Sequence, residues 1–315
     1  MRPIVVIFAS VVVVSMDIGL SAQTRTVDPP KKVESTVLPN TFRLTEKVLS
    51  GGQPQGEAAF KQLQELGVKT VISVDGAKPN VPLAKKYGLR YVHLPHGYDG
   101  IPKERLVELT KAVRELPGPI YIHCHHGKHR SPAAAAATCV AAGYLDNNQA
   151  LAVLEAAGTS KGYRGLFQTV REATPIDPKT LDATKVEFRE TADIPPLADA
   201  MIAIEHTHDN LKVIASAGWE ATEEHADIDP PHEALLLREH FTELLRTEEA
   251  KKQPAEFQRM LRQSEADAQK LEDGLRAGKL DQRMLTGLFE RITADCTSCH
   301  QKFRDIPIEE KAAVK

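Results

Sequence analysis

A cysteine and an arginine stand six positions apart in the run His-Cys-His-His-Gly-Lys-His-Arg-Ser, residues 123–131. This spacing lets one loop wrap around a tetrahedral oxyanion, with backbone N–H groups and the N-terminus of a following helix aimed at it. Arg130 can donate two parallel hydrogen bonds to phosphate oxygens, and Gly127 permits a backbone shape that a side chain would obstruct. The same field favours the thiolate of Cys124, which makes it a nucleophile. The loop therefore predicts phosphoryl chemistry, with Ser131 placed to hydrogen-bond the sulfur and help it leave.

Hydrolysis of a phosphate ester also needs an acid that protonates the leaving oxygen. Asp99 lies 25 residues before Cys124, on a glycine-flanked loop after a strand pattern, and is the preferred candidate. Asp75 follows another strand pattern and is its competitor. Either aspartate could instead only shape a turn, because Asp-Gly is a common turn pair.

The remaining side chains of the loop make it unusually cationic. They are His125, His126, Lys128 and His129. Together with the loop backbone they could bind phosphate, or they could point into solvent. Cys139 lies beyond the loop in an alanine-rich helical run, and we interpret it as a small buried residue.

Cys296, Cys299 and His300 form a second group with chemistry, in the pattern Cys-x-x-Cys-His. Two thiols one helical turn apart can form thioethers to the vinyl groups of haem, and the adjacent histidine then supplies the proximal iron ligand. A zinc site or a redox-active dithiol would use the same residue types. No second cysteine pair exists to complete a zinc site, although histidines could substitute. The pattern therefore predicts covalently bound haem c, with its iron on His300.

The elements that must position the first site alternate between strand and helix patterns through residues 42–173. Three short strand patterns are rich in β-branched or aromatic residues and cover 68–74, 91–94 and 120–122, the last ending at the loop. The helical patterns cover 57–66, 81–87, 103–116, 133–137 and 148–157. This alternation predicts an α/β domain with a mainly parallel sheet covered by helices.

Residues 174–195 are rich in proline and charge and lack a sustained apolar period, so we interpret them as a linker. Strand patterns vanish beyond it. Four helical stretches follow, at about 197–217, 232–249, 254–277 and 279–303. Four helices with short connections predict an all-α four-helix bundle over residues 196–305, followed by a tail at 306–315.

Residues 42–173 resemble the protein tyrosine and dual-specificity phosphatases. Every fixed position of the family signature, His-Cys-x-x-Gly-x-x-Arg-Ser/Thr, matches here. The likeness extends to Ser-Gly-Gly-Gln-Pro at 50–54 and Gly-Tyr-Asp-Gly at 97–100, which are similar to small bacterial dual-specificity-type members. The resemblance implies a thiophosphate intermediate on Cys124 and the acid role for Asp99. A lysine at the position of Lys128 resembles the loop of lipid phosphatases of the phosphatase-and-tensin type.

Residues 196–305 resemble the class II cytochromes c, of the cytochrome c′ type. In that family the haem motif is C-terminal and an arginine follows the ligand histidine by four, as Arg304 follows His300. The family's first helix places a residue over the distal haem face, and Met201 matches that position. If Met201 reaches iron, the haem is six-coordinate and suited to electron transfer. If Met201 only packs in the core, the haem is open to gases such as nitric oxide. His206 and His208 are rival distal ligands.

The first 22 residues have the pattern of a secretory signal peptide, with a positive start, a short apolar run and small residues up to a cleavage point near Ala22. An uncleaved membrane anchor is the alternative, but Ser15, Asp17 and Gly19 interrupt the apolar run. Residues 23–41 are polar, and we interpret them as a flexible leader. We therefore expect a periplasmic or otherwise exported protein.

The composition of the chain argues against one class of function. The chain has 315 residues, enough for two domains, with 42% hydrophobic side chains and a net charge of -3. This near-neutral balance argues against a general nucleic-acid binder, which would carry a strong basic excess.

Two functions remain for the whole chain. The first is an exported cysteine-dependent phosphatase, acting on a phosphorylated protein, lipid or small molecule, whose haem domain transfers electrons or senses redox state or gas. The second is an electron-transfer or gas-binding cytochrome whose phosphatase-like domain binds oxyanions or transfers sulfur. A redox partner protein and a homodimer through the helical bundle are further expectations.

Overall fold

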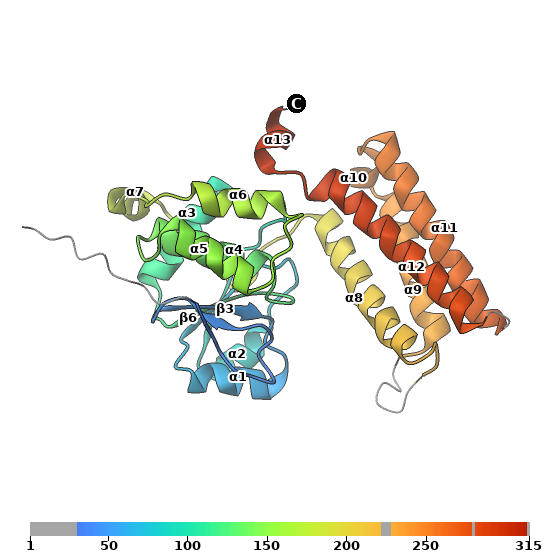
Figure 1. The fold of residues 1–315 in the computed structure, drawn as a ribbon, viewed down its shortest axis with the longest axis horizontal. Coiled ribbons are helices and arrows are strands. Elements are labelled where there is room, and N and C mark those ends of the chain that lie inside the picture. Colours follow the sequence, from blue (N-terminus) through green and yellow to red (C-terminus); the bar gives the residue numbers. More distant parts are fainter. Residues whose placement is uncertain (1–29, 222–227, 279–280, 314–315) are drawn as a thin grey trace, which may run out of the picture.

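The computed structural model describes residues 30–221, 228–278 and 281–313. The predicted signal peptide and the first part of the predicted leader lie outside these residues. Figure 1 shows a part built from a sheet and helices, followed along the chain by a part built from helices alone. Within the described residues, no helix has both the length and the apolar character needed to cross a membrane.

A six-stranded sheet forms the centre of the first part, in the order β1-β2-β3-β6-β4-β5. The strands are β1 (Lys31–Lys32), β2 (Phe42–Arg43), β3 (Val48–Gly52), β4 (Thr70–Ser73), β5 (Arg90–His93) and β6 (Ile120–Cys124). β3, β6, β4 and β5 pair in parallel, whereas β1 and β2 pair antiparallel at one edge. The sheet is therefore mixed, with the predicted parallel arrangement in the strands that carry the site.

Helices cover both faces of this sheet (Figure 1). One face holds α3 (Lys103–Glu115), α4 (Arg130–Ala141), α5 (Asn147–Ala156) and α6 (Arg164–Glu172), and the other holds α1 (Gly56–Glu65) and α2 (Val81–Lys86). All five residues of β3 and all five of β6 are buried, as expected for parallel strands covered on both sides. Every residue of α4 is buried too, since its alanines let it pack closely among sheet and helices. The predicted α/β architecture is confirmed for this part.

The predicted linker contains a short helix and makes contacts with the first part. It contains α7 (Pro178–Ala183), whose Leu181 is buried. Lys111 on α3 donates a hydrogen bond to the carbonyl of Leu181 at 2.8 Å. Farther along, the carbonyl of Arg189 accepts from the backbone N–H of His93 on β5 at 2.9 Å. The proline-rich stretch therefore packs against the first part before the chain leaves it.

The second part consists of helices that share one hydrophobic core. They are α8 (Pro196–Ser216), α9 (Pro230–Arg246), the short α10 (Glu248–Lys251), α11 (Ala255–Ala277) and α12 (Gln282–Cys299). Asp229 and Asp281 cap α9 and α12 by accepting from backbone N–H groups, which fixes where these helices begin. The third and fourth predicted stretches match α11 and α12, whereas the second ends earlier than expected because Thr247 caps a separate helix.

The described part of the predicted tail, residues 306–313, is not free of contacts with the rest of the protein. The π-helix η2 (His300–Arg304) follows α12 directly, and α13 (Ile308–Ala313) comes next. The N–H of Ile308 donates to the carbonyl of Asp99 at 3.1 Å, and Arg164 on α6 pairs with Glu310 at 2.8 Å. The predicted tail is therefore a helix that returns to the first part of the molecule (Figure 1).

Candidate active site

The predicted catalytic loop connects the end of β6 to the start of α4, so the N-terminus of a buried helix faces it. Gly127 adopts a φ of 71°, and a Cβ there would lie 2.4 Å from the backbone nitrogen of Gly52. The N–H of Gln53 donates to the carbonyl of His125 at 2.9 Å. The Ser-Gly-Gly-Gln-Pro run thus lies against the loop, and glycines are needed because the two backbones approach so closely.

Cys124 is 3% exposed at the floor of the loop. Its Sγ lies 3.3 Å from Oγ of Ser131, and that hydroxyl also donates to the carbonyl of Gly51 at 2.9 Å. A serine hydroxyl has one hydrogen. Ser131 must therefore turn that hydrogen from the carbonyl to the sulfur whenever the sulfur carries negative charge.

Arg130 is 7% exposed, and its guanidinium is held by a carboxylate. Oδ2 of Asp75 accepts from Nη2 of Arg130 at 2.8 Å and from the backbone N–H of His125 at 2.7 Å. Burial would raise the pKa of Asp75, but the nearby guanidinium and the backbone donors of Ala77 and His125 lower it to about 2. Asp75 is therefore ionised at neutral pH and positions Arg130 within the loop.

Asp99, the preferred acid, lies against the C-terminal helix. Its Oδ2 accepts from Nζ of Lys311 at 2.8 Å, while its backbone carbonyl accepts from Ile308. Asp75 is committed to Arg130 and holds no proton at neutral pH, so its environment suits a structural anchor and not a proton donor. The acid role of Asp99 stays a prediction.

Tyr98 links the loop to the residues after the Cys-x-x-Cys-His pattern. The guanidinium carbon of Arg130 lies 4.4 Å from the centre of its ring, and that of Arg304 lies 4.2 Å from the same centre. Such cation–π contacts are stabilising when partly shielded from water. Tyr98 belongs to the Gly-Tyr-Asp-Gly run at 97–100, but its contacts with Arg130 and Arg304 were not predicted from the sequence. Arg304 was expected at the haem.

The cationic side chains of the loop have unlike surroundings. His125, His126 and Lys128 line a cavity of about 500 Å³, which Asn40 also borders. His126 and Lys128 are exposed and His125 is half-buried. These three side chains therefore border space in which a substrate larger than phosphate could lie.

His129 has other neighbours and is not among the residues that line that cavity. It packs against the ring of Tyr163, with the two ring centres 4.7 Å apart. Burial, followed by the neighbouring cations, lowers the pKa of His129 to about 4. Its imidazole is therefore neutral at physiological pH and adds no positive charge to the loop.

The residues of the second group lie where α12 passes into the π-helix, an irregularity that is frequent at functional sites. Cys296 and Cys299 are free thiols, of which the first is half-buried and the second is buried. Burial, then the charge of Arg304, lowers the pKa of His300 to about 3, so its ring is neutral, the form that binds iron. In the described part of the chain these three do not converge on one point as zinc ligands would. A covalent haem, which engages the thiols through its vinyl groups, fits this donor set better.

Met201 packs against the same hydrophobic core as Cys296 and Phe303, on the first helix of the second part. Its rivals have other surroundings. Nε2 of His208 lies 2.9 Å from Oγ1 of Thr293, and its ring stacks on that of Phe289, a residue of that core. The ring centre of His206 lies 6.2 Å from that of His125, at the catalytic loop. Met201 as a distal ligand stays a prediction.

Comparison with known proteins gives matches among solved structures. No protein-family model and no curated protein matches the chain. The crystal structure of TpbA from P. aeruginosa is similar, with 23% identity and a TM-score of 0.41, over 50% of this chain and 96% of that one. The core catalytic domain of the PP-IP phosphatase SIW14 from S. cerevisiae gives 19% identity and a TM-score of 0.41, over 47% and 94%. The crystal structure of PTPMT1 in complex with PI(5)P gives 16% identity and a TM-score of 0.37, over 45% of this chain and 97% of that one.

Proposed function

We propose that this chain is a cysteine-dependent phosphatase that hydrolyses phosphomonoesters. The observation that carries the proposal is the loop between β6 and α4, where a buried cysteine, a hydroxyl 3.3 Å from its sulfur and a buried arginine lie together at a helix N-terminus. A nucleophile, an oxyanion clamp and a hydroxyl that can stabilise a departing thiolate are the parts that two-step phosphoryl transfer needs.

The reaction runs through a covalent intermediate. The thiolate of Cys124 attacks phosphorus, the ester P–O bond breaks, and Asp99 gives the leaving oxygen a proton. Arg130 and the loop N–H groups hold the phosphoryl oxygens throughout. Water then attacks phosphorus and loses a proton to the Asp99 carboxylate. The S–P bond breaks, inorganic phosphate leaves, and Ser131 donates its hydrogen bond to the departing sulfur.

We also propose that the second part is a cytochrome c′-type bundle that binds haem c through Cys296 and Cys299, with His300 as the iron ligand. The haem would supply one-electron chemistry or gas binding. Two free thiols, a neutral imidazole and an apolar core with Met201 support this assignment. Haem attachment of this kind accords with export, which the N-terminal sequence pattern favours.

One pair of variants tests the phosphatase. Cys124→Ser should reduce hydrolysis of an aryl phosphate to the uncatalysed background, because a serine hydroxyl is a far weaker nucleophile in this loop. Cys139→Ala is the matched control, since this thiol is buried in α4 and should leave turnover unchanged. Turnover retained by Cys124→Ser would rule out the mechanism. Persulfide formed on Cys124 without phosphate release would favour sulfur transfer instead.

A separate measurement tests the haem. Absorption spectra of the exported protein, with and without reductant, should show covalent haem that survives denaturation and is lost from Cys296→Ala/Cys299→Ala. Phosphate release by that double variant should persist. A protein exported without haem would remove the cytochrome assignment and leave the phosphatase standing.

A further inference from the structure

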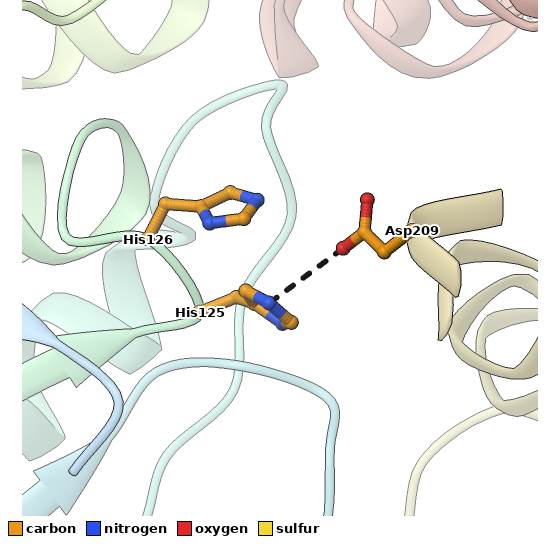
Figure 2. A group of neighbouring side chains, drawn as sticks. All are labelled: His125, His126 and Asp209. Atoms are coloured by element: carbon orange, nitrogen blue, oxygen red, sulfur yellow. Dashed lines mark ion pairs between the residues drawn. The ribbon is translucent and has the colours of Figure 1, made fainter. Parts of the chain in front are cut away.

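We propose that His125, His126 and Asp209 form a binding site for a divalent transition metal ion, with zinc as the ion that suits it best. Figure 2 shows two imidazoles from the catalytic loop and one carboxylate from α8 turned toward a common space. The site would join the two parts of the molecule. Its binding test depends on neither the phosphatase nor the haem function.

The three side chains converge closely enough to share one ion. Each offers one ligand atom, and these atoms all lie within 4.8 Å of one another. Nε2 of His125 and Oδ2 of Asp209 are 3.8 Å apart. A tetrahedral zinc ion with ligands at about 2.0–2.1 Å keeps them about 3.4 Å from one another. Small rotations of exposed or half-buried side chains would therefore bring this set onto one ion.

A direct hydrogen bond does not explain the arrangement. An N–H···O bond spans about 2.7–3.2 Å, which is shorter than the 3.8 Å between His125 and Asp209. The ring of His126 lies beside that of His125, with centres 4.2 Å apart. A metal ion that binds one nitrogen atom of each ring would draw the two rings and the carboxylate together.

The carboxylate of Asp209 has one oxygen available for an ion. Nζ of Lys212 donates to Oδ1 at 2.7 Å, while Oδ2 faces His125. Two imidazoles and one carboxylate form a donor set that zinc accepts, whereas calcium and magnesium prefer oxygen ligands alone. Glu205, one turn earlier on α8, acts electrostatically on His126 and adds negative charge near the site.

An ion at this position would fix the catalytic loop. Both histidines lie between Cys124 and Arg130, where the backbone N–H groups are expected to bind phosphate. Because α8 belongs to the helical part, the ion would hold the loop against that part. We therefore expect zinc to slow hydrolysis, a consequence that rests on the proposed phosphatase function.

Zinc binding is best measured on the full-length Cys124→Ser protein, which lacks the thiolate that would itself bind zinc. Equilibrium dialysis against Zn²⁺ gives the affinity. Asp209→Asn and His126→Gln should each weaken the binding at least about tenfold. Asp199→Asn removes the same charge from an exposed position in the same helix and should not. Zinc held elsewhere, such as by unmodified thiols of the Cys-x-x-Cys pair, is common to all these proteins and cancels.

The outcomes separate the possibilities. Equal affinity in Asp209→Asn and Asp199→Asn overturns the proposal, because α8 then supplies no ligand. Loss of zinc affinity in His126→Gln but not in Asp209→Asn also overturns the proposal, since the two imidazoles would then bind zinc without a ligand from α8. In protein that retains Cys124, a weaker zinc inhibition in Asp209→Asn than in Asp199→Asn supports the fixed loop. Zinc binding that follows these variants in a chain without phosphatase activity would refute the phosphatase function alone.

Discussion

Asp75 and Asp99 illustrate how burial decides the role of a residue type. Both aspartates precede a glycine and lie on a segment that follows a strand, so the sequence leaves their roles open. Asp75 is 3% exposed and accepts hydrogen bonds from Arg130 and the loop backbone. Asp99 is only half-buried, and its partner is a lysine from the far end of the chain. The first is a fixed anchor for the Arg130 guanidinium, whereas the second is held by one partly exposed ion pair.

Replacing Asp75 by asparagine should destabilise the protein strongly. The Arg130 guanidinium would remain buried without its counter-charge, and breaking a buried ion pair in this way costs about 3–5 kcal/mol. Denaturant unfolding followed by circular dichroism gives the free energy of unfolding. Asp182→Asn is the control, because its ion pair with Arg114 is exposed and worth about 0–1 kcal/mol. Equal losses in the two variants would contradict the anchoring role.

At this scale the sequence identified the candidate reacting groups but not their partners. The signature spacing identifies Cys124, Arg130 and Ser131 because one loop contains them all. The contacts of Arg130 with Asp75 and Tyr98 depend on how distant strands and loops end beside it. No spacing within one segment encodes such contacts.

At the scale of elements, strong local patterns were predictable and weak ones were not. β6 was expected because β-branched and aromatic residues lead directly into the loop. β3 was missed because it contains two glycines and a serine, which have low strand propensity. Both glycines are needed because β3 packs closely against its surroundings. A Cβ at Gly51 would lie 2.2 Å from the hydroxyl of Tyr121 on β6, and one at Gly52 would lie 3.2 Å from the carbonyl of His125 in the loop. The residues that weaken the strand pattern are thus the ones that let the site assemble.

The C-terminal helix α13 should restrain the proposed acid. While the carboxylate of Asp99 accepts a hydrogen bond from Lys311, that oxygen is not free to protonate a leaving group. Lys311→Ala should therefore raise kcat severalfold for alkyl phosphates, whose poor leaving groups need a proton. Aryl phosphates, with better leaving groups, should respond less.

Two further variants complete that experiment. Asp99→Asn should lower kcat for alkyl phosphates by about 10²–10⁴-fold, the usual contribution of a general acid. Glu309→Gln alters an exposed charge on the same helix and should leave both substrates unaffected. If Lys311→Ala matches Glu309→Gln while Asp99→Asn is impaired, α13 does not restrain the acid.

At the scale of the whole molecule, the two parts have separate hydrophobic cores and are joined by polar, cation–π and apolar contacts, such as those of Tyr98 with Arg304 and of Ile202 beside Gly76. Among the residues that the structure describes, the cores on the two faces of the sheet contain none from the helical part. The helical part has its own core. The contacts between them involve residues as far as 212 positions apart, such as Asp99 and Lys311. Composition and periodicity predicted two domains, but such distant pairings appear only once both are folded.

This separation predicts that the protein unfolds in two steps. Leu237→Ala, in the core of the helical part, should destabilise that part by about 2–5 kcal/mol, the usual result of creating a buried cavity. Leu109→Ala should do the same to the sheet-containing part. Scanning calorimetry of the full chain should then show two transitions, each lowered by only one of the variants. A single transition lowered equally by both would mean that the contacts through Tyr98 and α13 couple the two cores into one cooperative unit.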